Sequence, residues 1–277
     1  MKLAFSSNAF KKYSLEYSIK AIASIGYEGV ELLCDTPHAY PPDFGEERIR
    51  SIRDLLSSYS LRVSNLNAFT LYAIGDVYHP SWIEESEKLR ELRIKHTIDC
   101  LHLAKKIGVK NISTLPGGPM VNVDRKNIPQ LEKLFIEGLL RASKTAEKED
   151  VKILVEPEPS LFLENSTQFK NLMNKVNSEY VKLNFDIGHF FCVGEDPTKL
   201  VYELSDYAEH FHLADIAESR IHNHLIPGHG AIDFESVFNA INEIGYGGFI
   251  TVELYPYQSN PIEAAKKAFD YLRDIAI

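Results

Sequence analysis

A chain of 277 residues, 44% of them hydrophobic and 25% charged, has the composition of an ordinary soluble globular protein. Its 39 acidic residues outnumber its 30 basic ones, and the formal charge of -9 argues against a phosphate-backbone or anionic-membrane partner. We therefore expect a small-molecule partner, no nucleic acid and no membrane.

Cysteine usage and the N-terminus predict a cytoplasmic protein. Cys34, Cys100 and Cys192 are scattered and odd in number, which indicates neither a disulfide framework nor a thiolate metal site. Residues 1–10, MKLAFSSNAF, hold one short apolar patch, and nowhere do about 18 apolar residues follow one another. The sequence thus predicts no export signal and no membrane span.

Short segments rich in β-forming residues alternate with longer segments whose apolar residues recur at helical spacing. The expected strands are 2–7, 29–34, 62–69, 111–115, 152–157, 181–186, 210–215 and 249–255. About eight helices are expected, most clearly at 49–59, 92–108, 131–148 and 234–245, and glycines such as Gly26 and Gly108 follow helical runs as helix-terminating residues do. Eight βα units in about 250 residues predict a single (β/α)8 TIM barrel over 1–277, since no linker interrupts them and no early G-x-G-x-x-G turn marks a doubly wound sheet.

Strand parity predicts a polar barrel interior. Successive side chains of a strand point to opposite faces, so Asp186 shares a face with Asn184, and His212 shares one with His210. The other faces are apolar, as strands covered by helices require. At the C-terminal ends of the fifth to eighth strands, the polar face carries Glu156, Asp186, His212 and Glu253. That rim is where barrel enzymes have their active sites.

These four rim residues predict a metal site. Three carboxylates and an imidazole in a partly enclosed mouth repel one another and shift their pKa values unless a cation lies among them. Oxygen donors with one nitrogen and no thiolate favour one Mn, Mg or Co ion, with Zn also open. Taken singly, each residue could equally be an ion-paired residue at a strand end.

Four segments, LVEPEP, NFDIGH, HFHLADI and TVELYP, resemble in their order and separation the xylose isomerase-like TIM barrel family. This family includes sugar phosphate isomerases and epimerases, ketose 3-epimerases, inosose isomerases and dehydratases, and the endonuclease IV group. The resemblance covers the chain and is strongest over 151–256. It implies that Glu156, Asp186, His212 and Glu253 hold one divalent metal. It also implies that the two glutamates carry protons, and that His189, after the turn at Gly188, and Arg220 contact substrate oxygens.

The resemblance implies chemistry at the ketone of a sugar or cyclitol. With the carbonyl polarised by the metal, a carboxylate can remove the neighbouring proton and leave an enediolate. Return of a proton to the opposite face gives an epimer, return to another carbon gives an isomer, and loss of a hydroxyl gives dehydration. We expect an epimerase or isomerase of a ketose or cyclitol ketone, with a dehydratase as the alternative.

The stretch HNHLIPGHG, 222–230, leaves a further class open. His222 and His224 have the spacing of two residues that help to hold extra zinc ions in the endonuclease IV group, so they are candidates for a second metal or for a polar loop over the pocket. That group also has histidines at the ends of strands three and four, where this chain has Asn67 and Leu115. A nuclease is therefore disfavoured, as is a non-catalytic binding protein, because clustered carboxylates repel without a cation.

Three loop features are ambiguous from sequence. Glu158 shares the parity of Glu156 and His38 follows the second strand; each is a candidate substrate contact and equally a rim ion pair or a solvated residue. The long segment 69–86, with Tyr78 and Trp82, is expected to form a lid or pocket wall. The substrate's identity and phosphorylation stay open, as does assembly into a homodimer or homotetramer.

Overall fold

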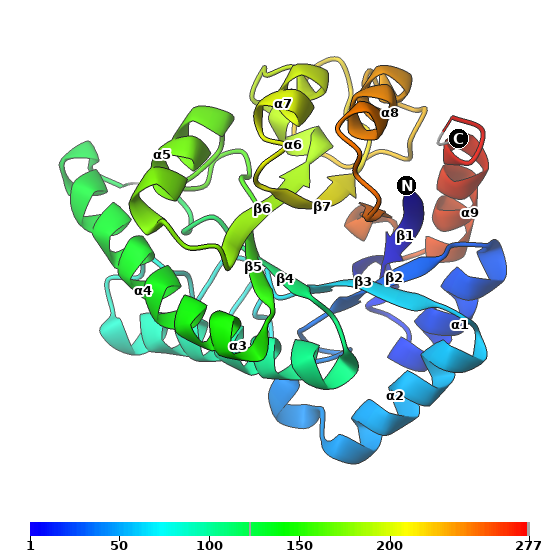
Figure 1. The fold of residues 1–277 in the computed structure, drawn as a ribbon, viewed down its shortest axis with the longest axis horizontal. Helices are drawn as coiled ribbons and strands as arrows, with labels where there is room; N and C mark the ends of the chain where they lie inside the picture. Colours follow the sequence, from blue (N-terminus) through cyan, green and yellow to red (C-terminus); the bar gives the residue numbers. More distant parts are fainter. Residues whose placement is uncertain (122, 276–277) are drawn as a thin grey trace.

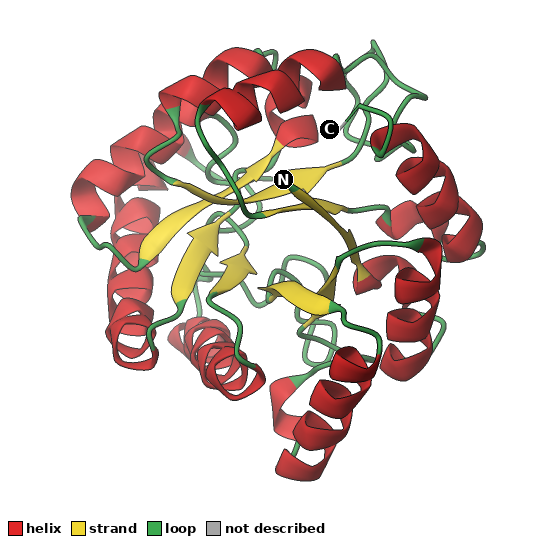
Figure 2. Cartoon of the chain, turned by 45° about the vertical axis from the view of Figure 1, so that its right-hand side comes forward, coloured by secondary structure: helices red, strands yellow, loops and turns green. Residues whose placement is uncertain are grey.

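Eight parallel strands close into one barrel in which each strand pairs with its sequence neighbours and β1 pairs with β8. The computed structural model describes residues 1–121 and 123–275. The strands are β1 (Lys2–Ser6), β2 (Gly29–Leu33), β3 (Arg62–Asn67), β4 (Asn111–Thr114), β5 (Lys152–Val155), β6 (Val181–Asp186), β7 (Ala208–Leu213) and β8 (Phe249–Val252). Figures 1 and 2 show them as an inner ring enclosed by helices, which confirms the predicted TIM barrel.

The described residues form nine α-helices, one more than expected. They are α1 (Leu15–Ile25), α2 (Glu46–Ser58), α3 (Glu87–Ile107), α4 (Ile128–Glu149), α5 (Ser166–Val176), α6 (Ile187–Cys192), α7 (Pro197–Glu203), α8 (Phe234–Glu243) and α9 (Pro261–Leu272). Short 3-10 helices lie at Ser7–Phe10, Pro41–Asp43, Arg125–Asn127 and Tyr255–Tyr257. No helix in residues 1–121 and 123–275 combines the length and apolar character needed to cross a membrane.

The extra helix is α6, which replaces the turn expected at Gly188. It starts there because Asp186 is its N-cap: the side chain of Asp186 accepts a hydrogen bond from the backbone N–H of His189 at 2.8 Å. The predicted helix-ending glycines are confirmed, since Gly26 and Gly108 adopt φ values of 117° and 91° after α1 and α3. Such positive φ values favour glycine, and the chain can then turn into the next strand.

The apolar core lies between the strands and the helices. Phe185 of β6 packs against Phe190 and Phe211, with ring centroids 4.8 and 5.1 Å apart, and all three rings are buried. Burial of each such side chain contributes about 1.5–3 kcal/mol. The opposite parity of the strands faces the barrel interior and is polar, as predicted: the buried side chains there include Glu31, Asn65, Ser113, Asn184, Asp186, His210, His212 and Thr251. Ser64, next to Asn65, also contacts Thr251, because the pairing of β2 with β3 shifts register there.

Candidate active site and metal centre

Four side chains from consecutive strand ends meet at the C-terminal rim of the barrel. One ligand atom each from Glu156, Asp186, His212 and Glu253 lies within 4.8 Å of those of the others, and all four residues are buried. The strand register explains part of this, because Asp186 of β6 pairs directly with His212 of β7. Glu156 and Glu253 come one residue after β5 and β8 end. The structure brings together the four residues that the sequence placed on the rim.

His212 lies between carboxylates on both sides of its ring. Its Nδ1 is 2.9 Å from Oε1 of Glu156 and 3.9 Å from Oε1 of Glu253, while its Nε2 is 2.6 Å from Oε2 of Glu31. Burial alone lowers the pKa of His212, but the charges of Glu31, Glu156 and Glu253 outweigh burial and hold that pKa well above its ordinary value. The imidazole therefore attracts a proton, which a metal ion bound at Nδ1 would replace.

An orphaned oxygen in the cluster fits a cation. Oδ2 of Asp186 is buried and has no hydrogen-bond partner among the described residues, whereas its Oδ1 accepts the N–H of His189. A buried carboxylate oxygen without a donor is costly, and ligation of a cation removes that cost. Burial also raises the pKa of Glu253 to about 8, against the attraction of His212. Carboxylate oxygens with one imidazole nitrogen form a donor set that suits a divalent metal ion.

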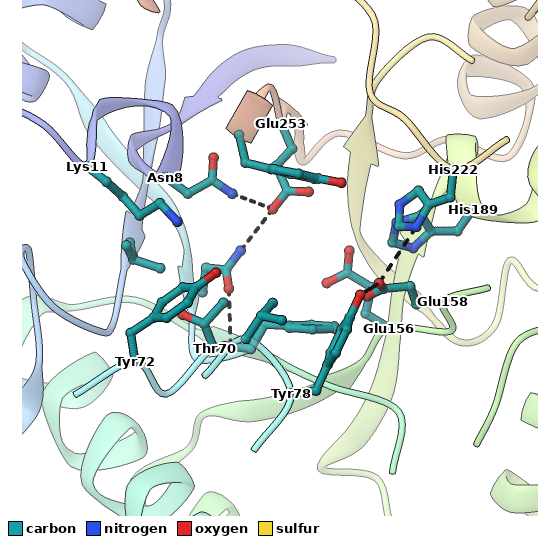
Figure 3. A pocket seen from close by; sticks show the side chains of 15 residues that line it. Asn8, Lys11, Thr70, Tyr72, Tyr78, Glu156, Glu158, His189, His222 and Glu253 are labelled. Atoms are coloured by element: carbon teal, nitrogen blue, oxygen red, sulfur yellow. Dashed lines mark hydrogen bonds and ion pairs between the residues drawn. The ribbon is translucent and has the colours of Figure 1, made fainter. Parts of the chain in front are cut away.

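Two amides fix the orientation of Glu253. Nδ2 of Asn8 and Nδ2 of Asn67 both donate to Oε1 of Glu253, at 2.7 and 3.2 Å (Figure 3). Asn8 lies in the 3-10 helix after β1, and Asn67 is the last residue of β3. With Oε1 occupied by two donors, Oε2 of Glu253 is the oxygen that is free to exchange a proton.

A cavity of about 230 Å³ opens above the cluster, and Glu156 and Glu253 both line it. This volume is below the roughly 300–1,000 Å³ typical of drug-sized ligands, so the cavity suits a small molecule. Its other polar and aromatic lining includes Asn8, Lys11, Asn67, Phe69, Thr70, Tyr72, Tyr78, Glu158, His189, His222 and Tyr255. Carboxylates, amides and aromatic rings around one small cavity can bind a polyhydroxylated molecule through hydrogen bonds and ring faces.

Glu158 faces this pocket from outside the metal cluster. Its Oε1 accepts a hydrogen bond from the hydroxyl of Tyr78 at 2.8 Å (Figure 3), and burial raises the pKa of Glu158 to about 7. The segment 69–86 therefore supplies a pocket wall through Tyr78. Trp82, in the same segment, is fully buried, and its Nε1–H donates to Oγ1 of Thr114 at 3.2 Å. Trp82 therefore anchors the segment to the barrel.

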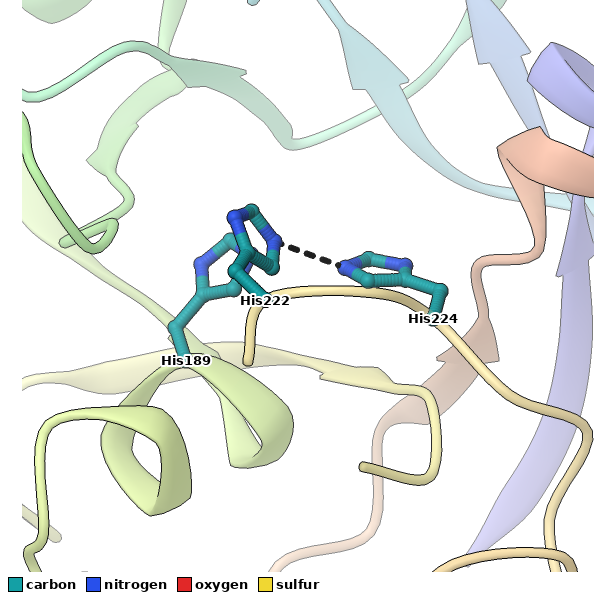
Figure 4. Close-up of side chains that lie close together, drawn as sticks. All are labelled: His189, His222 and His224. Atoms are coloured by element: carbon teal, nitrogen blue, oxygen red, sulfur yellow. Dashed lines mark hydrogen bonds between the residues drawn. The ribbon is translucent and has the colours of Figure 1, made fainter. Parts of the chain in front are cut away.

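His189, His222 and His224 form a second cluster (Figure 4). It lies beside the first, since Nε2 of His189 is 3.7 Å from Oδ2 of Asp186. Nδ1 of His189 is 2.9 Å from the carbonyl of Pro157, and Nδ1 of His224 is 2.8 Å from the carbonyl of Glu253. A carbonyl only accepts, so both Nδ1 atoms carry protons, and in a neutral ring Nε2 is then the accepting nitrogen. Nε2 of His222 is 3.2 Å from Nε2 of His224 and donates to it. Imidazoles held by backbone carbonyls in this way are typical of metal ligands.

Burial acts to lower the pKa of all three imidazoles, but neighbouring charges outweigh it at His189. It lowers the pKa of His222 to about 3 and that of His224 to about 4, so both are neutral. For His189, burial also acts to lower the pKa, but the charges of Asp186 and Glu158 outweigh it and leave the pKa raised. The cluster thus combines two neutral imidazoles with one that attracts a proton or another cation.

The structure places the other two predicted substrate contacts away from the pocket. His38 is buried after β2, with Nδ1 3.1 Å from Oγ of Ser7 and Nε2 3.2 Å from the carbonyl of Tyr13. Arg220 is exposed: its guanidinium packs over the ring of Phe191 at 4.4 Å and donates to the Phe191 carbonyl at 2.9 Å. Strand parity does not fix where a loop side chain points, so these two placements were not accessible from sequence.

Sequence reasoning missed several residues of the site. Glu31 on β2 contacts His212, Lys11 lines the pocket, and Asn8 and Asn67 hold Glu253. Glu31 had a readable signal, because it is the charged residue in the apolar strand GVELL and its parity sets it apart from its neighbours. Lys11 and Asn8 had none, since they lie in or directly after the short 3-10 helix that follows β1.

Comparison with known proteins identifies relatives over the whole barrel. The family model described as Xylose isomerase-like TIM barrel matches residues 19–275. An inosose dehydratase of Lacticaseibacillus casei is 25% identical over 282 residues, which cover 95% of this chain and 90% of that protein. Among solved structures, an IOLI protein with a bound zinc atom has a TM-score of 0.81 at 21% identity, covering 100% of this chain and 98% of that one.

A D-tagatose 3-epimerase-like protein has a TM-score of 0.79 at 20% identity and covers 99% of both chains. At such identities the two solved structures establish a shared fold and nothing finer.

Proposed function

Because the chain belongs to the xylose isomerase-like TIM barrel family, we propose that it is a divalent-metal-dependent enzyme that removes a proton beside the carbonyl of a sugar ketone or cyclitol ketone. The observation that carries this proposal is that Glu156 and Glu253 belong both to the candidate metal cluster and to the pocket lining. An inosose dehydratase that is 25% identical to this chain supports the same substrate class.

In the proposed mechanism, Glu156, Asp186, His212 and Glu253 hold the divalent ion, which supplies positive charge that makes the C–H beside the substrate carbonyl more acidic. One of the two glutamates takes the proton from that carbon, and an enediolate remains in the pocket. Oε2 of Glu253 suits a proton-transfer role because Asn8 and Asn67 restrain Oε1. His189, which lines the pocket, stabilises negative charge on a substrate oxygen.

The first candidate outcome is epimerisation or isomerisation. The second glutamate returns a proton to the opposite face of the same carbon, which gives an epimer, or to the neighbouring carbon, which gives an isomer. Two carboxyl groups from the ends of β5 and β8 on one small cavity support this exchange, because each turnover consumes one proton and restores one.

The second candidate outcome is dehydration, and a specific observation favours it. Loss of a hydroxyl from the carbon beyond the enediolate needs a proton donor for the departing oxygen. Glu158 lies outside the metal cluster, faces the pocket and shares a hydrogen bond with Tyr78, so it can supply that proton. The step breaks one C–H and one C–O bond, and it releases one water molecule and an unsaturated ketone.

The three imidazoles of His189, His222 and His224 could hold a second metal ion. As the alternative, we propose that these side chains form part of the pocket wall. Binding there requires His222 to carry its proton on Nδ1, which is 3.8 Å from Oε1 of Glu158, so that Nε2 becomes a ligand. A second ion would favour metal-dependent hydrolysis over proton transfer. Asn67 and Leu115 argue against the nuclease arrangement because neither offers an imidazole.

The test is incubation of manganese-loaded protein with a panel of ketoses and cyclitol ketones in deuterium oxide. A product with the same molecular formula as the substrate, apart from one hydrogen replaced by deuterium, identifies an epimerase or isomerase. A product that has lost one water molecule relative to the substrate identifies a dehydratase. The double variant Glu156→Gln/Glu253→Gln is the control and is expected to give neither. If metal-loaded wild-type protein exchanges no carbon-bound proton in any of these ketones, the proposal is wrong.

A further inference from the structure

Glu31 is a buried carboxylate on β2 that the proposed reaction does not use. Its Oε1 accepts from Oγ of Ser6 at 2.7 Å and from Nδ2 of Asn67 at 3.2 Å. Its Oε2 accepts from Nδ2 of Asn65 at 2.7 Å and is 2.6 Å from Nε2 of His212. Side chains of β1, β3 and β7 therefore converge on one carboxylate inside the barrel.

An ionised carboxylate is required at this position because the groups around it donate. Two donors reach each oxygen of Glu31, and the carboxylate is the side-chain group that accepts on both atoms. A glutamine would turn an NH2 group toward one of the two donor pairs.

The contact with Glu31 also fixes which nitrogen of His212 faces the metal cluster. Because Glu31 only accepts, Nε2 of His212 must carry a proton. Nδ1 is then the nitrogen directed at Glu156, 2.9 Å away, and toward Glu253, 3.9 Å away. The neighbouring imidazole, His210, does not compete for the carboxylate, since its Nε2 is 3.9 Å from Oε2 of Glu31 and has no hydrogen-bond partner.

We propose that Glu31 is a positioning residue that holds Nε2–H of His212 and thereby presents Nδ1 of His212 as the metal-binding atom. The inference rests on the proposed function, since it takes His212 as a ligand of the divalent ion. A carboxylate behind a ligating histidine fixes its tautomer and ring orientation and makes it a stronger ligand. The alternative is a purely structural role, in which Glu31 only accepts hydrogen bonds from the amides of Asn65 and Asn67. That role would affect the stability of the fold but not the metal affinity.

The experiment compares zinc affinity in wild-type protein, Glu31→Gln and Asp35→Asn by competition with a chromophoric chelator. Asp35 is the matched control: it is also fully buried at the end of β2, but it accepts from Oγ1 of Thr70 and from the backbone N–H of Ala73, away from the cluster. Glu31→Gln is expected to bind zinc about 10- to 100-fold more weakly, and Asp35→Asn is expected to match the wild type. Thermal melts of the metal-free proteins separate lost stability from lost affinity.

The outcomes distinguish this inference from the proposed function. If wild-type protein binds zinc and Glu31→Gln binds it equally well, the positioning role is overturned while the proposed function stands. If wild-type protein binds no metal, the proposed function fails first. Should Glu31→Gln not fold, long-range proton–nitrogen NMR of zinc-loaded wild-type protein decides: a proton on Nε2 of His212 with zinc on Nδ1 is expected, and the reverse arrangement overturns the inference.

Discussion

Replacing Glu253 with glutamine is expected to abolish proton transfer while leaving the barrel folded. The carbonyl oxygen of glutamine can accept the amide hydrogen bonds of Asn8 and Asn67 that Oε1 of Glu253 accepts now, so the local contacts survive. What the variant loses is the carboxyl group that exchanges a proton. General acid–base catalysis of this kind contributes about 10²–10⁴-fold. That factor corresponds to about 3–5 kcal/mol of transition-state stabilisation.

The assay is incorporation of solvent deuterium into the substrate, with the metal content of each sample measured in parallel because Glu253 is also a candidate ligand. Glu158→Gln is the matched control, since it makes the same substitution in the same pocket but outside the cluster. It is expected to keep C–H exchange, and to lose product formation if the reaction is a dehydration. Wild-type exchange rates in both Glu253→Gln and Glu156→Gln, each folded and metal-loaded, would refute the reasoning.

Three further predictions follow from contacts at the metal cluster, in the pocket and in the core. Metal affinity should rise with pH up to about 8, because below that pH the metal-free Glu253 carboxyl holds a proton that the metal must displace; a flat profile in titration calorimetry contradicts this. Tyr78→Phe removes the 2.8 Å hydrogen bond to Glu158 and should raise KM about tenfold at unchanged metal content, whereas an unchanged KM means that Glu158 does not bind substrate. Gly138→Ala would place a Cβ 2.9 Å from the buried Trp82 ring, so despite better helix propensity it should lower the free energy of unfolding by about 1–2 kcal/mol in urea; an increase contradicts the packing argument.

The rim of the barrel could be predicted from sequence because backbone geometry fixes it. Side chains alternate along a strand, and parallel neighbours keep their C-terminal ends at one edge. Asp186 and His212 can therefore be recognised as polar residues on the inward faces of their strands. In the structure they pair directly with each other across β6 and β7. The same logic, applied to the charged residue in GVELL, finds Glu31 as well.

Loop residues farther from the strand ends, such as His38 and Arg220, could not be predicted in this way, because local hydrogen bonds decide their direction. His38 turns toward Ser7 and the carbonyl of Tyr13, and Arg220 turns toward Phe191, so neither lines the pocket. The sequence suggested a turn at Gly188, but the backbone N–H of His189 donates a hydrogen bond to the N-cap Asp186, and α6 starts there. Asp186 thus has two roles, because one carboxylate oxygen caps α6 and the residue is also a candidate metal ligand.

Metal stoichiometry tests the central claim most directly. Purified protein is loaded with manganese and separately with zinc, dialysed and measured by elemental analysis beside Asp186→Asn, which keeps an oxygen for the N–H of His189 but loses the charge. We expect one tightly bound ion in the wild type and little or none in the variant. A second ion would assign His222 and His224 to another metal site; a wild-type protein that binds no ion would contradict the proposed metal site.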